Sequence, residues 1–538
     1  MAASVCSFLY FWRQDALLLY GDAVAHLNIA RRVFDSRTPG PLQLGTVWLP
    51  LPHLLEMPLV FSDWLWRTGV GGSVVSMASY VAGALGIHRL ARALGAGRAA
   101  WLATAIFVAN PNLLYLQTTA MTEPLYLALW IWTIVHFAEF AASVRSPEPK
   151  LRGLAPNSLE RCGILLAAAV MTRYDAWFGA LLLLPFVVWP YIGRRRMFSD
   201  SPDAALRASL RRFLLLALAT PALWMAYNYG VYGNAVEFAT GPYSARGIAA
   251  QTTPEGSPPH PGHRDVRVAG IYFLKAVRLN LGDGFWQNPL LLAAVAGSVL
   301  ALGSARSAAA AALLWFPALF YPLSMAYGSV PIFVPVWWPF SFYNVRYGLQ
   351  LLPAVAVFSA VLLAGVWNRL ESFAGRTASS VLAVVLVAGS YASAAMTGPI
   401  CLREARVNSV TRVALERQVA AELARLPQEA TLLMHLGSHG GALQRAGIPL
   451  RRVIHEGNYR QWEWALSAPG EAVDYLVAFA GDAVSASAEA NAARLEAVAE
   501  IEVPGQPGAT VYRTLRQAPR SEEPPGEAGN GDGTIARP

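Results

Sequence analysis

The chain has 538 residues, of which 55% are hydrophobic and 14% charged, with a formal net charge of +8. About 25% of the residues of a soluble domain are charged, so this composition excludes an ordinary soluble protein. Arginine supplies nearly all of the positive charge and collects in short loops between apolar runs, which excludes a nucleic-acid-binding surface. The three cysteines are far apart and form neither a disulfide framework nor a zinc-binding pattern.

Apolar runs of membrane-spanning length predict an α-helical polytopic membrane protein with about eleven transmembrane helices. The first run is interrupted by Arg13, Gln14 and Asp15 and is too short to cross about 30 Å of hydrocarbon. For this short first run we favour a chain start further upstream over a partial helix. The predicted helices cover residues 3–13, 72–87, 99–116, 121–142, 160–172, 175–192, 213–230, 287–303, 307–327, 347–366 and 379–397.

Loop charges predict the orientation of these helices. If the first helix starts inside, most of the arginines fall in loops on one side, which marks that side as the cytoplasm. We therefore expect a catalytic membrane domain over residues 1–397, in which 231–286 is a long, lid-like outer loop because its middle is rich in Pro and Gly. The outer face receives the first outer loop 14–71, the turns 117–121 and 172–175, the loops 231–286 and 328–346, and everything after 398.

After Met396 helical and strand-like segments alternate, which predicts a small α/β extracytoplasmic domain over residues 398–516. The Pro-, Gly- and Glu-rich tail 517–538 is predicted to be disordered. We expect strands at 430–436, 451–455, 473–478, 501–503 and 510–514, and helices at 413–426, 441–446, 459–466 and 485–499.

The first outer loop carries the first candidate site residues, Asp22 and His26, whose spacing of four places both on one face of a helix. Asp22 could act as a general base on an acceptor hydroxyl, or hold a divalent cation together with His26. The alternative is an interfacial helix whose polar face contains both by chance. His53 and Glu56 form a weaker candidate metal pair.

Arg31 and Arg32 lie on the outer side, against the topological bias. Because a guanidinium matches a phosphate in a two-pronged geometry, phosphate binding would explain their placement. Surface pairing with Asp35 is the alternative, and we prefer it for Arg37. Glu123 opens a long apolar helix near the same surface, where it could serve a site or simply complement the helix dipole.

Two further polar groups lie at the outer ends of predicted spans. Arg173 and Asp175 stand in TRYDAW, and Asn344, Arg346 and Tyr347 stand in NVRY. A charge near hydrocarbon is costly, so it either pairs with a neighbour or lines a wet cavity. With Asp22 and Glu123, four separate polar groups face one side of the membrane, which favours a single site at the outer leaflet.

These residues resemble those of the GT-C superfamily of membrane glycosyltransferases, above all the bacterial relatives of protein O-mannosyltransferases and lipid A aminoarabinose transferases. The segments that carry the resemblance are YGDAVAHLNIARR, MTEPLYLAL, TRYDAW and NVRYGLQLLP, over roughly residues 20–366. The resemblance implies an enzyme that moves a sugar, with inversion, from a polyprenyl phosphate to a glycan, lipid or protein acceptor at the outer face of the cytoplasmic membrane.

The resemblance also implies roles for single residues. Asp22 is the expected catalytic base, Glu123 a second catalytic acid residue, and Arg173 and Arg346 the expected ligands of the donor phosphate. Asp22 is followed by Ala23 instead of a second acid, unlike in protein mannosyltransferases, which counts against a protein acceptor. The remaining expected substrate-binding residues are His26, Arg31, Arg32, Asp175, Asn344 and Tyr347.

Three alternatives remain open at this point. The D-x-x-x-H spacing is also similar to that of metal-dependent oligosaccharyltransferases, although no W-W-D-type motif follows in the C-terminal part. A transporter of a lipid or glycan would also be polytopic, but it should show repeated halves, and none is seen. A membrane-anchored binding or assembly protein could use His435, His439 and His455 of the C-terminal region.

Overall fold

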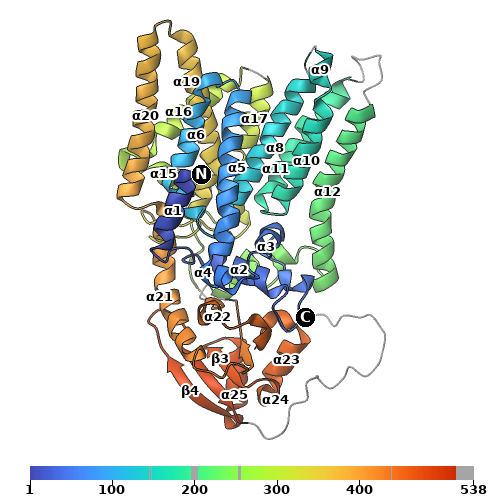
Figure 1. Ribbon diagram of the computed structural model, residues 1–538, viewed down its shortest axis with the longest axis vertical. Helices are drawn as coiled ribbons and strands as arrows, with labels where there is room; N and C mark the ends of the chain where they lie inside the picture. The colour runs from blue at the N-terminus through green and yellow to red at the C-terminus, as the bar shows by residue number, and fades with distance from the viewer. Residues whose placement is uncertain are drawn as a thin grey trace.

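The computed structural model describes residues 1–144, 146, 148–194, 204–252, 256–303, 305–437 and 439–515. The predicted disordered tail 517–538 lies outside these residues. Long helices stand side by side in the upper part of the molecule, and a small α/β region forms the lower part (Figure 1). The short helices of the first outer loop lie between the two parts.

The long-helix part is a multi-pass membrane unit. Seven helical stretches of the described chain are long and apolar enough to cross a membrane, and each of the predicted ranges falls largely on helix. The helices are α1 (Ala2–Trp12), α5 (Val70–Ala93), α6 (Ala100–Ala109), α7 (Pro111–Leu116), α8 (Glu123–Val144), α9 (Pro149–Arg152), α10 (Ala155–Val170), α11 (Asp175–Arg194), α12 (Ala204–Tyr232), α16 (Pro289–Ala301), α17 (Ala305–Trp315), α18 (Pro317–Tyr327), α19 (Leu352–Arg369) and α20 (Phe373–Met396).

Two of the predicted spans are broken in the structure. The range 99–116 divides at Asn110, whose side chain accepts hydrogen bonds from the backbone N–H groups of Asn112 and Leu113 and so caps α7. Pro111 follows as the first residue of α7, a position where its missing N–H costs nothing. The range 307–327 divides before Pro317 into α17 and α18, but without a capping side chain, and Phe316 keeps a helical backbone.

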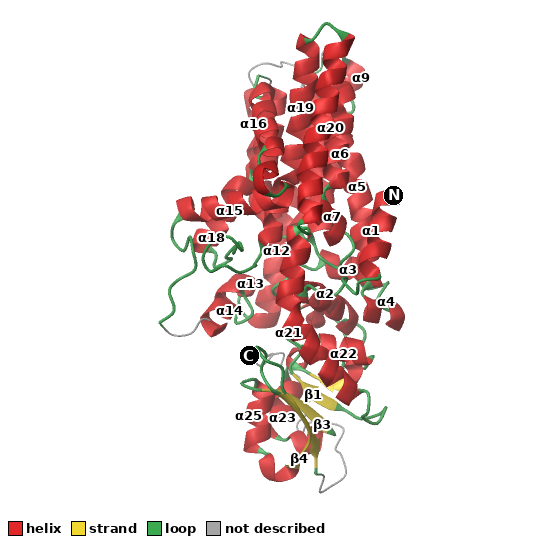
Figure 2. Ribbon diagram, turned by 90° about the vertical axis from the view of Figure 1, so that its left-hand side faces the viewer, coloured by secondary structure: helices red, strands yellow, loops and turns green. Residues whose placement is uncertain are grey.

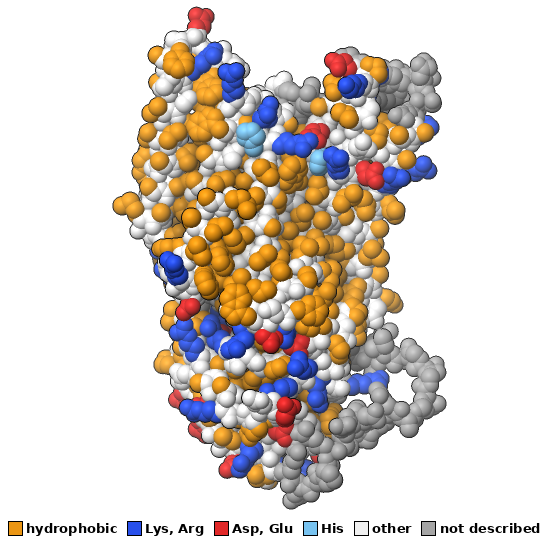
Figure 3. Space-filling model, in the orientation of Figure 1, with side chains coloured by type: hydrophobic (Ala, Val, Ile, Leu, Met, Phe, Trp, Pro, Cys, Tyr) orange, Lys and Arg blue, Asp and Glu red, His pale blue; other side chains and the backbone are white. Residues whose placement is uncertain are grey.

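The surface of the helical part agrees with a membrane location. Apolar side chains cover a broad band over the long helices, and Lys and Arg gather at its upper edge and again over the lower part (Figure 3). Large apolar side chains of α12, α16 and α20, such as Leu215, Leu292 and Leu382, are 58–66% exposed, which suits contact with lipid.

The loops that the sequence predicts to be outer loops are largely helical. The first outer loop contains α2 (Gly21–Arg32), η1 (Pro41–Leu44), α3 (Leu51–Glu56) and α4 (Asp63–Thr68). The lid-like loop 231–286 is only partly irregular, because it contains α13 (Glu237–Thr240), α14 (Ala245–Thr252), α15 (Val266–Leu281) and the start of η3 (Gly284–Gln287).

Helix α15 fixes the position of the segment that follows the last long outer loop, η4 (Val345–Leu351). The two approach so closely at Gly348 that a Cβ there would collide with the backbone of Ala276. Asn344 precedes η4 with a left-handed backbone (φ 55°), which asparagine tolerates better than most residues. This tight packing holds η4 in place against α15.

The lower part is one five-stranded mixed sheet in the order β2-β1-β3-β5-β4. Strand β1 is parallel to β2 and β3, whereas β5 is antiparallel to β3 and β4. The expected small α/β unit is therefore present. Its elements are α21 (Ile400–Leu423), β1 (Leu432–Met434), α22 (Gly441–Ala446), η5 (Leu450–Arg452), β2 (Val453–Ile454), η6 (Glu456–Asn458), α23 (Arg460–Ser467), α24 (Pro469–Ala472), β3 (Tyr475–Phe479), α25 (Ala483–Ala490), η7 (Ala492–Arg494), β4 (Leu495–Ile501) and β5 (Ala509–Thr514).

One predicted helix is wrong in its second half. Helix α25 ends at Ala490, and Leu495–Ile501 pairs with β5 instead of continuing the predicted helix 485–499. The sequence LEAVAEI has good helix formers, but hydrogen bonding to the neighbouring strand outweighs this local preference.

The two faces of the sheet pack against different cores, as the alternation of side chains along a strand requires. Leu432, Met434 and Val477 join the main core, which continues through α21 and α22 into the helical part. Leu433 and Leu476 instead form a second, small core with residues of α23 and α25. The sheet is thus packed onto the membrane unit without a break in the core.

Candidate active site

Arg346, the second residue of η4, is the centre of the candidate site. Its guanidinium contacts three carboxylates from three helices: Asp22 of α2 at 2.6 Å, Glu123 of α8 at 3.2 Å and Glu404 of α21 at 3.2 Å. The backbone N–H of Arg346 also donates to Glu404, at 3.3 Å. Residues that are hundreds of positions apart in the chain therefore meet at one arginine.

Arg173, in the turn between α10 and α11, extends this arrangement. It contacts the same Glu123 oxygen at 3.1 Å and Asp175 at 3.1 Å. Tyr321 of α18 accepts a hydrogen bond from Arg173 at 3.3 Å and donates one to Asp175. Glu123 thus bridges the two guanidiniums, and we call Asp22, Glu123, Arg173, Asp175, Arg346 and Glu404 the charged cluster.

Aromatic rings enclose the two guanidiniums. The ring centre of Tyr347 lies 5.1 Å from the guanidinium carbon of Arg173 and 5.2 Å from that of Arg346. The Tyr20 ring lies 5.1 Å from Arg346, and the Tyr126 ring 5.9 Å from Arg173. Such contacts favour a cation over each ring face, so the rings hold both arginines in place without neutralising them.

Solvent reaches the charged cluster at Asp22. The side chain of Asp22 is 40% exposed, whereas those of Arg346 and Glu123 are 9% and 0% exposed. The cluster has four carboxylates for two guanidiniums, so each guanidinium is shared between carboxylates. Asp22, at the mouth of the cluster, is the one that solvent and a ligand can reach.

His26 belongs to a neighbouring contact and does not bond to Asp22. Its Nδ1 lies 2.8 Å from Nε2 of His53, and its ring packs against Trp48 at 4.8 Å between ring centres. Burial lowers the pKa of His26 to about 4 and that of His53 well below its usual value. Both imidazoles are therefore neutral near pH 7 and supply no positive charge to a phosphate.

Acidification is expected to destabilise the protein through His26. An unfolded histidine has a pKa near 6.5, so the unfolded chain binds more protons between this value and the folded pKa of about 4. Stability is therefore lost as the pH falls through this window. We expect thermal unfolding at a lower temperature at pH 5 than at pH 7.5, and a smaller difference in His26→Asn. A pH effect of equal size in His26→Asn would contradict this role.

Three predicted site residues have other partners. Arg31 is buried and bonds through its three nitrogens to Asp35 at 2.8 Å, the Val60 carbonyl oxygen at 2.7 Å and Asp63 at 2.6 Å. This guanidinium stabilises the first outer loop and has no bond to the charged cluster. Arg32 donates to the Gln43 carbonyl oxygen at the far end of α2. The side chain of Asn344 donates to the Pro331 carbonyl oxygen at 3.0 Å and serves the turn before η4.

The predicted metal ligands Asp22 and His26 are not joined by a third ligand among the described residues. Over the part of the chain that the structure describes, no three His, Cys, Asp or Glu side chains gather closely enough to hold a metal ion. Asp22 contacts Arg346 and His26 contacts His53, so the two candidates do not point to a common centre.

Glu404 is the main site residue that the sequence did not indicate. It lies in the first turns of α21, after the last span, and it is 1% exposed. It also accepts a hydrogen bond from the Tyr20 hydroxyl at 3.3 Å. The sequence offered one signal for Glu404: it is an acid in ICLREARV, shortly after an apolar helix. In the structure this first part of α21 is largely buried.

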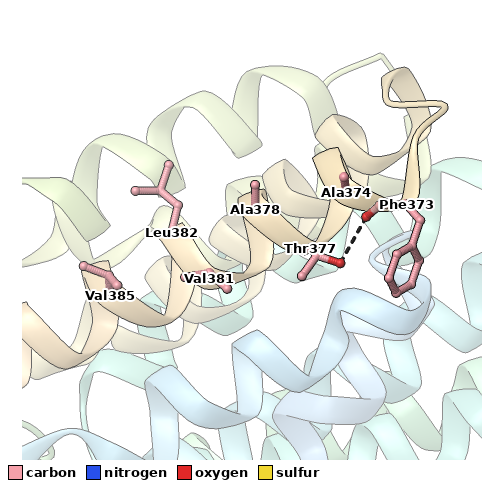
Figure 4. A pocket seen from close by; sticks show the side chains of 7 residues that line it. All are labelled: Phe373, Ala374, Thr377, Ala378, Val381, Leu382 and Val385. Atoms are coloured by element: carbon pink, nitrogen blue, oxygen red, sulfur yellow. Dashed lines mark hydrogen bonds between the residues drawn. The ribbon is translucent and has the colours of Figure 1, made fainter.

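A recess along α20 has no charged side chain in its lining, unlike the charged cluster. Figure 4 shows that its lining is apolar except for Thr377, whose hydroxyl donates to the Phe373 carbonyl oxygen at 3.0 Å. It is lined by Phe373, Ala374, Thr377, Ala378, Val381, Leu382 and Val385. A shallow apolar surface of this kind suits lipid chains.

Two solved structures of one protein resemble most of this chain in fold. ArnT from Cupriavidus metallidurans in the apo state matches with a TM-score of 0.55 at 13% identity, over 94% of this chain and 97% of that chain. The same protein bound to undecaprenyl phosphate matches with a TM-score of 0.54 at 14% identity and the same coverage. ArnT is a GT-C membrane glycosyltransferase. The chain has the GT-C fold.

Other comparisons add little to this assignment. AglB from Archaeoglobus fulgidus, in complex with an inhibitory peptide and a dolichol-phosphate, matches with a TM-score of 0.47 at 12% identity, over 89% of this chain and 69% of that chain. No family model matches the chain, and no curated protein matches it in sequence. The GT-C fold expected from the sequence motifs is therefore confirmed by the match to ArnT.

Proposed function

We propose that this protein is an inverting glycosyltransferase that moves a sugar of the hexosyl type from a polyprenyl phosphate to an acceptor hydroxyl. The observation that carries the proposal is the charged cluster: two caged guanidiniums joined by Glu123, with the exposed Asp22 at the mouth. The undecaprenyl phosphate bound to ArnT supports a lipid phosphate as the ligand of this fold.

We place the reaction at the outer face of the cytoplasmic membrane. In this proposal residues 1–397 form the catalytic membrane domain and 398–516 an extracytoplasmic domain. Helix α2, which carries Asp22 of the charged cluster, lies at the same end of the long helices as the sheet, opposite the turns that contain α9 and join α19 to α20 (Figure 1). Those opposite turns carry Arg152, Arg369 and Arg376, as expected of cytoplasmic loops.

The donor phosphate is proposed to replace Asp22 as a partner of Arg346. The other two carboxylates that contact Arg346, Glu123 and Glu404, are buried and fixed, so Asp22 is the partner that can leave. A phosphate can accept two parallel N–H bonds from a guanidinium. Donor binding would then release the Asp22 carboxylate beside the anomeric carbon, where a free base is needed.

The released Asp22 takes the proton of the acceptor hydroxyl as its oxygen attacks the anomeric carbon. The bond between this carbon and the phosphate oxygen breaks on the opposite side, so the configuration inverts and polyprenyl phosphate leaves with the electron pair. Arg346 and Arg173 stabilise the charge that grows on the phosphate, which lowers the barrier more than it strengthens donor binding.

Purified protein in lipid nanodiscs, supplied with radiolabelled polyprenyl-phosphate hexose and an extract of envelope glycolipids, tests the activity. Transfer of label from the polyprenyl donor to a second product is the expected result. Donor binding without any transfer, together with uptake of label into sealed vesicles, would instead support a transporter. Absence of both donor binding and transfer would remove the charged cluster from lipid-phosphate chemistry.

A further inference from the structure

A second cationic position lies at the other end of α2. Arg32, the last residue of α2, is ten residues beyond Asp22, about 15 Å along the helix axis. Its Nε donates to the Gln43 carbonyl oxygen at 2.5 Å, and no ion pair found among the described residues includes it. The adjacent Arg31, by contrast, is paired with Asp35 and Asp63.

Burial of this guanidinium is not offset by a contacting carboxylate. Desolvation lowers the pKa of Arg32, and Glu456 only partly opposes the effect. Glu456 accepts a hydrogen bond from the Leu436 backbone N–H at 2.9 Å, so it is held in place by the sheet region. A partly buried cation without an ion-pair partner favours binding of an anion.

Two buried polar atoms beside Arg32 also have no partner. They are Oε1 of Gln43 and Nε2 of His455, whose side chains are 1% and 0% exposed. The two side chains meet at Gly457, where a Cβ would lie 3.1 Å from Gln43 Oε1 and 3.1 Å from His455 Nδ1. Buried polar atoms are normally hydrogen-bonded, so one acceptor and one imidazole nitrogen are left unsatisfied here.

The protonation of His455 follows from its contacts. Its Nδ1 accepts a hydrogen bond from the Gly457 backbone N–H at 3.1 Å. Burial lowers the pKa of His455 to about 4, so the ring is neutral near pH 7. The single proton of the neutral ring must then be on Nε2, which makes this unpartnered atom a hydrogen-bond donor.

Tyrosines from two parts of the chain complete the surroundings of Arg32. Tyr227 and Tyr232 come from the end of α12 and Tyr459 from the region after β2, and all three act electrostatically on Arg32. The hydroxyls of two of them reach the first outer loop: Tyr227 donates to the Pro41 carbonyl oxygen at 3.2 Å and Tyr459 to that of Leu42 at 3.4 Å. We call Arg32, Gln43, His455, Tyr227, Tyr232 and Tyr459 the Arg32 junction.

We propose that the Arg32 junction binds the acceptor and that this acceptor is an anionic saccharide. A guanidinium for the anion, with one unsatisfied donor and one unsatisfied acceptor for sugar hydroxyls, matches this chemistry. The inference rests on the proposed function, because it assigns the charged cluster to the donor. A separation of about 15 Å along α2 requires the anionic group to lie more than one sugar ring from the hydroxyl that reacts.

Binding of a soluble probe tests this site apart from the donor site. N-acetylglucosamine 1-phosphate is titrated into the full chain in zwitterionic nanodiscs, followed by ligand-detected NMR, with N-acetylglucosamine and inorganic phosphate as separate arms. The sugar phosphate should bind more tightly than either. Arg32→Gln should weaken its binding about tenfold or more, because a hydrogen bond to a charged group contributes about 1.5–3 kcal/mol.

Matched variants separate the two sites. Arg37→Gln removes the same charge from an exposed position of the same loop and should leave probe binding unchanged; Asp35, the partner we expected for Arg37, pairs with Arg31 and Arg451 instead. Arg346→Lys should change polyprenyl phosphate binding and not probe binding. Arg32→Lys, which keeps the charge, should retain part of the affinity if Arg32→Gln does not fold.

Four outcomes would overturn the inference: wild-type protein that does not bind the probe, equal affinity in Arg32→Gln, equal weakening in Arg346→Lys, or inorganic phosphate that binds as well as the sugar phosphate. If the wild-type protein does not bind polyprenyl phosphate at all, the proposed function is refuted instead. The probe arm would still report on the Arg32 junction in that case, so the two failures are distinguishable.

Discussion

Asp22→Asn is expected to reduce sugar transfer by about 10²- to 10⁴-fold, the usual contribution of a positioned general base. Asparagine keeps the shape of the side chain but cannot take the proton of the acceptor hydroxyl. Because the Asp22 side chain is 40% exposed, loss of its ion pair with Arg346 should cost little stability. Radiolabel transfer and polyprenyl phosphate binding, measured on the same preparation, check the prediction.

Asp15→Asn is the matched control for this substitution. Asp15 is an exposed acid in the same outer loop, and its left-handed backbone (φ 52°) is one that asparagine also adopts readily. We expect wild-type transfer in Asp15→Asn. In Asp22→Asn we expect donor binding to be unchanged or tighter, because Arg346 loses a carboxylate that competes with the phosphate. Transfer at the wild-type rate in Asp22→Asn would remove this residue from the base role.

Arg346→Lys is expected to weaken donor binding and to lower turnover, both by about tenfold or more. Lysine keeps the charge but cannot bind a phosphate and two carboxylates with one planar group. The comparison of the donor concentration at half-maximal rate with the maximal rate separates the two effects. Unchanged values for both would mean that Arg346 only supports the fold.

Arg346→Ala should instead destabilise the protein. It leaves Glu123 and Glu404 buried without the arginine that contacts both, and removal of one partner from a buried ion pair costs about 3–5 kcal/mol. A clear drop in the temperature of thermal unfolding, absent in Arg346→Lys, is the expected result. Equal thermal stability of the two variants would show that the carboxylates are satisfied in another way.

Much of the charged cluster was predictable because its residues lie next to hydrocarbon, where an unpaired charge costs free energy. Arg173 and Arg346 are charged residues at the ends of apolar runs. The predicted topology alone placed them on the same side of the membrane as Asp22 and Glu123. The pairing scheme was not predictable, because it depends on side-chain geometry. Arg31 illustrates this: its guanidinium contacts Asp63, 32 residues away, a partner that the sequence spacing did not indicate.

The C-terminal part shows where local patterns fail. The run from Leu495 to Ile501 favours helix by composition but forms β4, because β5 lies beside it. Glu404 was missed because it lies beyond the last predicted span, in a region that the sequence assigned to the separate α/β domain. The feature that gives it a role, contact with an arginine 58 residues earlier, is a property of the fold.

Helix α21 connects the charged cluster to the α/β region through side-chain contacts as well as through the backbone. Its first turns hold Glu404 against Arg346, and its later turns hold Glu416 against Arg412 and against Arg445 of α22. A tilt of the sheet on the membrane unit would therefore shift a carboxylate of the charged cluster. A partner that binds the sheet would change the surroundings of Arg346 without contacting the charged cluster itself.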